Sequence, residues 1–446
     1  MATFGQGSGN QGSKSVTMLR MDGYAGYTLV SDEAPDALLT RVGRGTPGGE
    51  YLRRFWQPIA YLHELTDVPL RARLLGEDLV VFKDRRGEVG VLFLHCSHRG
   101  TSLEYGLIAE RGIRCCYHGR VYDVDGTVLD MPGEPAADRL KAHVRQGAYP
   151  VHVFGGIVFT YMGPPDQVPP FPSYDRFDLP GVQLAPGPRL PFACNWVQIK
   201  ENAMDPAHTA VLHAIEGQGV FSEEFGKFPE IAWMETPVGT AYFAIRHVGD
   251  NVWVRSTDVI MPNIHSITSI FEDGHTRKQA GLPWLTIWTA PVDDENSINF
   301  CLCHMAEGDD MPLEQRLTVM GFGQTPNRPY AERQRIPGDY DAMVSQGPVA
   351  IHEREQLGSL DAGVILFRRC LRKSIEAVQR GEDPLGLLRE SGFCAETYGT
   401  DLVIPAGDMP GDSANEADRR AFLQQLAARY LAEPPFRTLR RESVAV

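Results

Sequence analysis

Hydrophobic and polar positions change their period along the chain, and these changes divide it into parts. Residues 34–57 carry helical signals on both sides of a Gly-Thr-Pro-Gly turn. From about residue 70 to residue 160, short apolar runs are punctuated by Gly and Asp, which predicts short β-strands. The remainder mixes strand-like runs with helical periods at about 200–214, 362–380 and 417–431. The pattern predicts an α+β protein in which a small all-β domain precedes a larger domain of sheet and helices.

Segments of biased composition, rich in Gly, Ser, Gln or Pro, predict the domain boundaries. The Gly/Ser/Gln-rich start predicts a flexible N-terminal tail over residues 1–35. Residues 36–162 then form the N-terminal helices and the small β domain. The stretch GPPDQVPPFPSYD, residues 163–175, is rich in proline and predicts a linker, with a long surface loop as the alternative. Residues 176–446 form the larger domain.

Charge and composition narrow the classes of partner. The chain of 446 residues has a formal net charge of −14, which disfavours nucleic acids and anionic membranes but does not forbid an anionic substrate. No apolar run is long enough to cross a membrane, and the first residues lack the apolar core of a signal peptide, so we expect a cytoplasmic protein. The eight cysteines are then expected to be thiols or metal ligands rather than disulfides.

Two mixed Cys/His pairs stand in the predicted β domain, in the stretch LHCSHRGTSLEYGLIAERGIRCCYHGR. They are Cys96 with His98 and Cys115 with His118. A structural zinc site usually takes pairs of one kind. A Rieske [2Fe–2S] centre instead binds one iron through two cysteines and the other through two histidines. The spacing favours a Rieske centre over zinc, and by itself leaves Cys116 open as a ligand in place of Cys115.

A second metal site is indicated by NWVQIKENAMDPAHTAVLHA, residues 195–214. Asp205 before Pro206 is a common helix start, so capping alone could explain it. His208 and His213 lie about 140° apart on a regular helix, and they converge on one metal only if the helix widens or breaks. Two histidines and one carboxylate are the donor set of non-haem Fe(II) oxygenases. A single histidine on a helix is more often structural, so the pair carries the prediction.

The carboxylate of this second site must come from another part of the chain. A helix is predicted within EREQLGSLDAGVILFRRCLRKSIEAVQRGEDP, with Val364 and Leu371 on its apolar face. Asp361 stands just before this helix and could also be its N-cap. Glu353 and Glu355 are the rival candidates.

Together these motifs resemble the oxygenase component, or α subunit, of Rieske non-haem iron aromatic-ring oxygenases, over roughly residues 36–390. The stretch CSHRG…CCYHGR is similar to the family's C-P-H-R-G…C-P-Y-H-G-W, with Ser97, Cys116 and Arg120 at the Pro, Pro and Trp positions. This alignment implies that Cys115 is the ligand. The stretch ENAMDPAH…H is similar to E-N-x-x-D-x-x-H-x4-H, and LGSLDAGVILFRR resembles the segment that holds the third iron ligand, which implies Asp361.

The resemblance implies two metal centres and their ligands. It implies a β-sandwich Rieske domain and a helix-grip catalytic domain, an antiparallel sheet with helices. The implied [2Fe–2S] ligands are Cys96, His98, Cys115 and His118. The implied ligands of the mononuclear Fe(II) are His208, His213 and Asp361. Asp205 is implied as a catalytic bridge that links a Rieske histidine of one subunit to an iron-bound histidine of the next.

The resemblance also implies the partners. NAD(P)H would act only through a separate reductase or ferredoxin, and the chain has no strand–G-x-G-x-x-G–helix unit for a nicotinamide. O2 is the implied co-substrate, and a homotrimer or a dimer of trimers is the implied assembly.

The stretches LLTRVGRGTPGGEYLRRFWQPIA and MVSQGPVAIHEREQLGS resemble the phthalate dioxygenase-like branch, which includes the O-demethylases of lignin-derived biaryls such as 5,5′-dehydrodivanillate. The branch implies an aromatic acid as substrate, and we expect monooxygenation that O-demethylates a methoxylated aromatic carboxylic acid. The alternatives are cis-dihydroxylation of a phthalate- or chlorobenzoate-type acid and a role as Rieske electron carrier only. Arg246 is the candidate anchor for the substrate carboxylate, unless it is an ordinary solvated or salt-bridged strand residue, and Asn202 is a second candidate contact.

Overall fold

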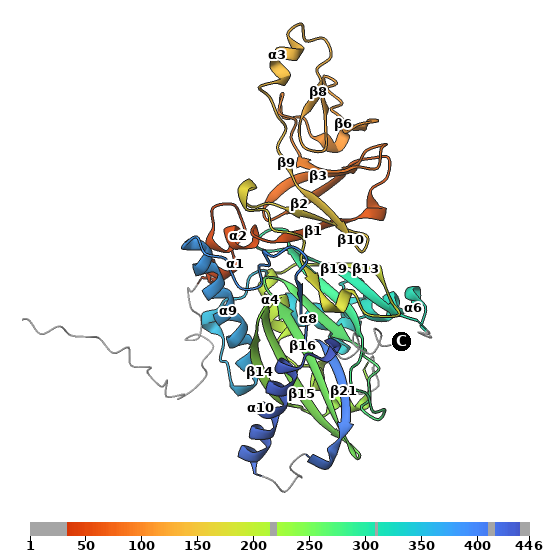
Figure 1. Ribbon diagram of the computed structural model, residues 1–446, viewed down its shortest axis with the longest axis vertical. Helices are drawn as coiled ribbons and strands as arrows, with labels where there is room; N and C mark the ends of the chain where they lie inside the picture. The colour runs from red at the N-terminus through yellow and green to blue at the C-terminus, as the bar shows by residue number, and fades with distance from the viewer. Residues whose placement is uncertain (1–33, 215–220, 308–310, 409–414, 438–446) are drawn as a thin grey trace, which may run out of the picture.

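A β-rich N-terminal part stands on a larger α+β part in the computed structural model (Figure 1). The structure describes residues 34–214, 221–307, 311–408 and 415–437. The predicted flexible tail over residues 1–35 therefore lies, except for its last two residues, outside the described part of the chain. Within the described residues, no helix is both long and apolar enough to cross a lipid bilayer.

The N-terminal part contains two small antiparallel sheets of four strands each. The first sheet has the order β2 (Leu70–Leu74), β3 (Glu77–Lys83), β4 (Val89–Phe93) and β9 (Ala148–Tyr149). The second has the order β5 (Leu107–Ile108), β6 (Ile113–Arg114), β7 (Val121–Tyr122) and β8 (Val128–Asp130), with helix α3 (Ala137–Lys141) beside it. Side chains of both sheets share one core, so the predicted small all-β domain is confirmed.

A three-stranded sheet joins the N-terminal part to the larger part. It consists of β1 (Trp56–Tyr61), β11 (Ile157–Tyr161) and β10 (Val151–Phe154). The hydroxyl of Tyr61 donates to the carbonyl oxygen of Cys301 at 3.1 Å and accepts from its N–H at 2.9 Å. The ring of Phe159 lies edge-on against Trp288 with centroids 5.4 Å apart. Because one hydrophobic core crosses this junction, the two parts are packed directly against each other.

The larger part is built on an eight-stranded antiparallel sheet. Its strands, in spatial order, are β13 (Val182–Phe192), β19 (Ser297–Ala306), β18 (Pro283–Pro291), β17 (Ile264–Thr268), β16 (Asn251–Ile260), β15 (Gly239–Val248) and β14 (Glu230–Thr236), and β21 (Thr400–Pro405) also pairs with β16. Strand β16 is buried along its whole length. This near-continuous burial shows that other elements cover both faces of the sheet there.

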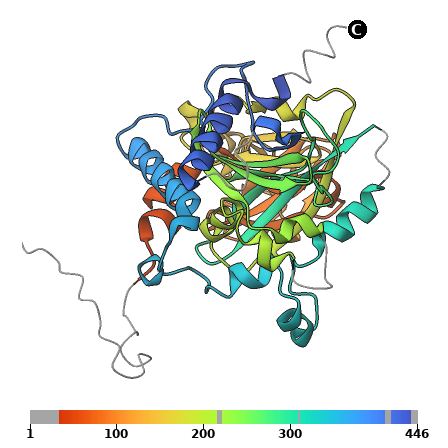
Figure 2. The ribbon, with the colours of Figure 1, turned by 90° about the horizontal axis from the view of Figure 1, so that it is seen from below.

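Helices cover the sheet in separate groups. Helix α10 (Glu416–Ala432) packs on β14 and β15, where its side chains share a core with apolar residues of the sheet. Helix α9 (Ala362–Gln379) lies beside α1 (Ala37–Thr40) and α2 (Pro47–Leu52), as Figure 2 shows. Val364 and Leu371 are buried on α9, as its amphipathic pattern predicted. Helices α4 (Trp196–Ala203), α6 (Leu313–Gly321) and α8 (Asp339–Val344) pack near β13, β18 and β19 and enclose the site described below.

The remaining described elements connect these layers. They are α5 (Thr209–Leu212), α7 (Tyr330–Arg335), β12 (Ser173–Tyr174), β20 (Cys394–Ala395), and the 3-10 turns Leu62–Glu64, Leu103–Tyr105, Pro165–Gln167, Asp175–Phe177, Glu223–Gly226, His352–Arg354, Ser359–Asp361 and Ala406–Asp408. The helix predicted over 200–214 is in fact two helices, α4 and α5. The break falls at Asp205 and Pro206, because proline has no N–H to continue the helix and its ring hinders the preceding residue from taking helical angles.

Candidate metal centres and substrate cavity

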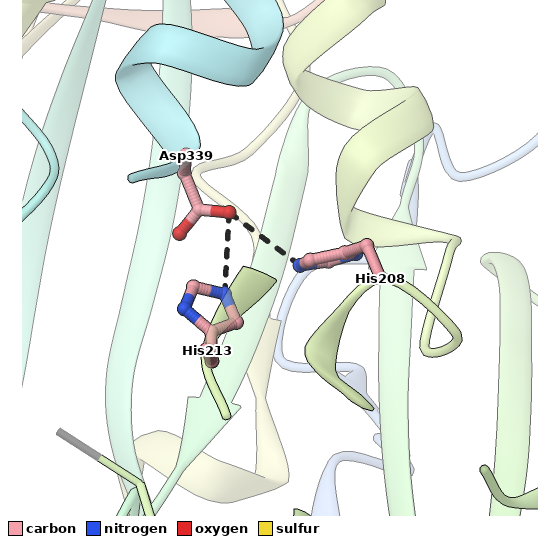
Figure 3. A group of neighbouring side chains, drawn as sticks. All are labelled: His208, His213 and Asp339. Carbon is pink, nitrogen blue, oxygen red and sulfur yellow. Dashed lines mark ion pairs between the residues drawn. The ribbon is translucent and has the colours of Figure 1, made fainter. Parts of the chain in front are cut away.

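Three side chains converge where α5 faces the start of α8. The Nε2 atoms of His208 and His213 lie 3.4 Å and 3.3 Å from Oδ1 of Asp339, and Figure 3 shows both imidazoles turned toward this oxygen. The three donor atoms all lie within 4.8 Å of one another. Two imidazoles and one carboxylate at this spacing have the donor types and the geometry of a mononuclear non-haem iron site.

The shortness of α5 is what lets the two histidines converge. His208 and His213 flank its single turn, one at the N-cap and the other at the C-cap, instead of lying within one long helix. Oδ1 of Asp205 accepts from the backbone N–H groups of Ala207 at 2.9 Å and His208 at 3.3 Å, which starts the new turn after Pro206. The sequence predicted that the histidines converge only if the helix is distorted, and the end of α5 at Leu212, before His213, is that distortion.

The third member of the cluster corrects the sequence prediction, which named Asp361. Oδ2 of Asp361 accepts from the backbone N–H of Gly358 at 2.6 Å, which closes the 3-10 turn Ser359–Asp361, and the residue does not belong to the cluster of the two histidines. Of the rivals, Glu355 is paired with Arg368 and Glu353 is exposed. Asp339 takes the place of the third ligand because α8 begins at the cavity, with its first turn toward α5.

Opposing charges define the electrostatics of the cluster. Burial alone would lower the pKa of His208, but Asp205 and Asp339 raise it to about 10. Burial would raise the pKa of Asp339, but His213 and His208 hold it well below its ordinary value. The cluster therefore concentrates negative charge that favours the protonated form of His208 when no metal is bound, and a divalent cation would balance this charge instead.

Two amides hold the carboxylate of Asp339 in position. Gln324 donates from Nε2 to Oδ2 at 2.6 Å, and Asn202 donates from Nδ2 to Oδ1 at 3.4 Å. Behind the histidines, Oδ2 of Asp205 lies 3.6 Å from Nδ1 of His208. The cluster therefore has the outer contacts that orient ligands at metal sites.

A mostly apolar cavity of about 120 Å³ opens directly onto the cluster. His213 and Asp339 form part of its wall, and apolar side chains of β13, β17, β18 and α6 form a large part of the remainder. Asn202 also lines it. A reacting molecule in this cavity would lie beside the open side of the cluster.

Arg246 does not reach this cavity. Its Nε donates to the carbonyl oxygen of Lys227 at 3.0 Å and its Nη2 donates to Oγ1 of Thr209 at 3.1 Å. The guanidinium also lies over the rings of Phe225 and Trp253, with its carbon 5.2 Å and 5.3 Å from the centroids. The prediction that Arg246 anchors a substrate carboxylate is therefore wrong, and the side chain braces α5 instead.

The two predicted Cys/His pairs lie on adjacent loops at the tip of the N-terminal part. Cys96 and Cys115 are buried, whereas His98 and His118 are exposed with ring centroids 4.6 Å apart. Each loop closes with the same turn: the N–H of Gly100 donates to the carbonyl oxygen of Cys96 at 2.9 Å, and Gly119 repeats this with Cys115 at 3.1 Å. Both glycines have positive φ values, which side-chain-bearing residues rarely adopt.

This arrangement fits a [2Fe–2S] cluster with an inner iron and an outer iron. The buried thiols could hold the inner iron and the exposed imidazoles the outer one. Sγ of Cys96 also lies 2.9 Å from the hydroxyl of Tyr122, a contact of the kind that tunes a cluster. Cys116 is exposed. This exposure favours Cys115 over Cys116 as the second thiol, beside Cys96, that binds the inner iron.

Comparison with known proteins agrees with this reading. The Rieske [2Fe-2S] domain model matches residues 55–150. The chain is 44% identical, over 90% of its length and 91% of the relative's, to the tert-butanol monooxygenase / tert-amyl alcohol desaturase oxygenase subunit of Aquincola tertiaricarbonis. It is 38% identical to the phenoxybenzoate dioxygenase subunit alpha of Ectopseudomonas oleovorans, over 79% of this chain and 88% of that protein. The chain belongs to the Rieske non-haem iron oxygenases.

Other Rieske oxygenases share the fold. The 5,5′-dehydrodivanillate O-demethylase oxygenase subunit of a Sphingobium strain is 32% identical over 81% of this chain and 84% of that protein. Pseudomonas putida CBB5 NdmA (QL mutant with caffeine) superposes with a TM-score of 0.60 at 20% identity, covering 78% of this chain and 99% of that one. Dicamba monooxygenase bound to dicamba superposes with a TM-score of 0.58 at 18% identity, covering 74% of this chain and 99% of that one. The predicted fold class, a Rieske domain with an antiparallel-sheet catalytic domain, is confirmed.

Membership of the Rieske oxygenases establishes the cofactors. The protein uses a Rieske [2Fe–2S] cluster and a mononuclear non-haem iron, as predicted. Relatives are named as the alpha subunit or the oxygenase component of their enzymes, so those proteins act together with further components. Asp339 is the site residue that the sequence prediction missed. In the sequence, Asp339 is marked only by its place after a glycine at the start of a helix, and many aspartates occupy such a place.

Proposed function

We propose that this protein is the terminal oxygenase of a multicomponent system that monooxygenates a carbon atom of a compact, mainly apolar substrate. His208, His213 and Asp339 hold the iron, and Cys96 and Cys115 hold the [2Fe–2S] cluster together with His98 and His118. An iron with these three protein donors has open positions for O2 and supplies oxygen activation. The protein's own contribution is to place the reacting carbon beside those positions and to keep water out.

The size and the walls of the cavity carry this proposal. A dry cavity of about 150 Å³ is known to hold benzene. The cavity beside Asp339, at about 120 Å³, suits a single ring or a branched chain of similar size rather than a biaryl. Its walls are mostly aliphatic and aromatic, so burial of apolar substrate surface supplies most of the binding free energy. The 44% identical relative is named for two branched alcohols of this size.

Demethylation is the second candidate, because it also begins with hydroxylation of a carbon atom. The O-demethylation of a methoxylated aromatic carboxylic acid, expected from the sequence, has support from the 32% identical O-demethylase subunit. A methoxylated single ring is compatible with the volume of the cavity. The expected carboxylate anchor, Arg246, is not available there. The cis-dihydroxylation that was the alternative has support from the relatives named dioxygenases.

Electrons must cross between chains for this function. Within one chain, the sheet that carries the Cys/His loops stands at the end far from α4 and α8 (Figure 1). The face of α4 opposite the substrate cavity borders a groove lined by four carboxylates and two guanidinium groups, among them Asp205. The exposed tip of the Rieske domain carries Arg99 and Arg120 near His98. The Rieske tip of a neighbouring copy binds in this groove, with Asp205 as the bridge, in a homotrimer or a dimer of trimers.

A single-turnover reaction tests the proposed function. Pre-reduced protein with both metal sites full is mixed with O2 and a panel of tertiary alcohols, methoxybenzenes and aromatic acids, and products are read by mass spectrometry. A product heavier by one oxygen atom is the expected result. Formaldehyde with a product lighter by CH2 would establish O-demethylation. A product heavier by two oxygen and two hydrogen atoms would overturn the proposal, as would equal product from an Asp339→Ala control.

A further inference from the structure

A lysine without a counter-ion lies behind the wall of the substrate cavity. Lys200 of α4 is completely buried, and its Nζ lies 2.5 Å from Nδ1 of His265 on β17. Among the described residues, no carboxylate forms an ion pair with Lys200. A buried ammonium without such a partner is costly, so the amine and the imidazole must satisfy one another.

The contact between Lys200 and His265 fixes the orientation of the imidazole. Burial lowers the pKa of the Lys200 amine well below its ordinary value. Burial, Lys200 and Arg176 together lower the pKa of His265, against a smaller opposite effect of Asp339. Because Nδ1 is paired with the amine, Nε2 is the remaining ring nitrogen, and it donates or accepts according to the tautomer. His265 lines the cavity and Lys200 does not, so Nε2 is the ring nitrogen available to a bound molecule.

Three other polar side chains on the wall of the cavity already have a partner. Asn202 and Gln324 both donate to Asp339. The side-chain oxygen of Asn299 accepts from Oγ1 of Thr289 at 2.6 Å. Within the described residues, neither lysine nor arginine lines the cavity, so it offers no cation for a carboxylate. Nε2 of His265 has no hydrogen-bond partner in the same part of the chain.

We infer that His265, held by Lys200, is the group that recognises the substrate, and that the substrate is an uncharged molecule whose single oxygen function, a hydroxyl, forms a hydrogen bond with Nε2. This inference rests on the proposed function, because it concerns the same cavity. The hydrogen bond fixes one end of a compact apolar molecule, and the apolar wall takes the remainder. Orientation by one polar contact in an apolar cavity determines which carbon faces the iron site.

Three isosteric probes test the inference without turnover. The probes are 2-methylbutan-2-ol, 2,2-dimethylbutane with a methyl group in place of the hydroxyl, and 2,2-dimethylbutanoate with a carboxylate there. Their dissociation constants are measured by equilibrium partitioning with the iron-loaded, oxygen-free holoenzyme. Wild type is compared with His265→Leu, with Lys200→Met and with the double variant. The double variant removes both polar partners together, which avoids leaving a buried amine unpaired.

The expected result is a selective loss of affinity for the alcohol. Removing one hydrogen bond weakens binding of 2-methylbutan-2-ol roughly three- to tenfold in His265→Leu and in the double variant, with a smaller effect in Lys200→Met. Binding of 2,2-dimethylbutane stays within about twofold of wild type, and the carboxylate binds most weakly throughout. Ile287 lines the same cavity without a polar atom, so Ile287→Val is the control that changes alcohol and hydrocarbon equally.

Two results would overturn the inference alone. One is an equal loss of alcohol and hydrocarbon in His265→Leu, which would mean that the imidazole only shapes the wall. The other is a wild type that prefers the carboxylate to the alcohol. Failure of wild type to bind either uncharged probe would instead contradict the compact cavity of the proposed function, and the inference would fall with it.

Discussion

Gln324 donates a hydrogen bond to one oxygen of Asp339, while the other oxygen of that carboxylate faces the two histidines. The amide therefore occupies Oδ2 at 2.6 Å and leaves Oδ1 as the atom directed at a metal. A carboxylate restrained in this way binds through one oxygen and keeps an additional position on the metal open for other ligands.

Replacing Gln324 should weaken the iron site. In Gln324→Leu the carboxylate loses its restraint, and iron affinity should fall roughly 10- to 100-fold, as it does for outer contacts of other metal sites. Iron content after dialysis against a graded chelator measures the effect. Gln346 lines the groove on the other side of α4 and has no contact with Asp339 among the described residues, so Gln346→Leu is the matched control. Unchanged iron retention in Gln324→Leu would remove this role.

Asp339 and Asp361 can be distinguished directly. Asp339→Ala removes one of three ligands and should leave the mononuclear site largely without iron, while the [2Fe–2S] cluster stays intact. Asp361→Ala should keep the iron and lose only the hydrogen bond from the Gly358 N–H, at a cost of about 1 kcal/mol of stability. Iron and sulfide analysis, together with thermal unfolding, reads both effects. The reverse pattern would restore the assignment of Asp361.

The adjacent cysteines should behave in opposite ways. Cys115 is 3% exposed inside the loop, whereas Cys116 faces solvent. Cys115→Ser should abolish the visible and paramagnetic signals of the [2Fe–2S] cluster, and Cys116→Ser should retain them at full iron and sulfide content. A cluster that survives Cys115→Ser and disappears in Cys116→Ser would mean that the loop re-folds around the metal.

Asp205→Asn should separate metal binding from electron transfer. Asparagine can still cap the turn before Ala207, so both metals should remain bound. Oxidation of the reduced cluster by O2 in the presence of substrate should slow by roughly 10- to 100-fold, because the bridge to His208 loses its charge. Stopped-flow absorbance of the cluster measures this rate. Loss of the mononuclear iron itself would count against a bridging role.

A buried carboxyl far from the metals should make stability depend on pH. Oδ1 of Asp175 accepts from Oγ1 of Thr397 at 2.5 Å, and burial, partly opposed by Thr397 and Arg176, raises the pKa of Asp175 to about 6. The unfolded carboxyl ionises near pH 4. Between these values the folded state holds a proton that the unfolded state has released, so its stability falls as pH rises and the loss is complete above about pH 6.

The Asp175→Asn variant should remove this loss. A shift of about two pKa units corresponds to about 3 kcal/mol, so the variant should gain up to that amount over wild type at pH 8 and much less at pH 5. Thermal midpoints of both proteins at the two pH values provide the comparison. An equal difference at pH 5 and pH 8 would show that the carboxyl does not titrate in this range.

The sequence was sufficient wherever a site is local in the chain. The Cys96–His98 and Cys115–His118 loops each fit within a few residues, and their spacing alone indicated the chemistry. His208 and His213 are five residues apart, and helix geometry alone indicated that they converge only if the helix widens or breaks. The strand pattern between residues 70 and 160 was equally local, because each hairpin pairs neighbouring segments.

The third ligand was not local, and the prediction failed there. Asp339 and Asp361 both stand at helix starts, and capping is a reason for aspartate that needs no metal. Only the packing of α8 against α4 and α5 decides which carboxylate faces the histidines. Arg246 failed for a related reason: alternation along β15 gives two faces of a strand but does not tell which helix covers each face.

The cavity lies between elements that play different parts. The iron donors come from α5 and the start of α8, whereas a large part of the wall comes from β13, β17, β18 and α6. Substitutions on these strands can therefore change the shape of the accepted molecule while the oxygen chemistry stays the same. Such a division makes the scaffold evolvable: a lineage can acquire new growth substrates by single changes in the wall without passing through an inactive ancestor.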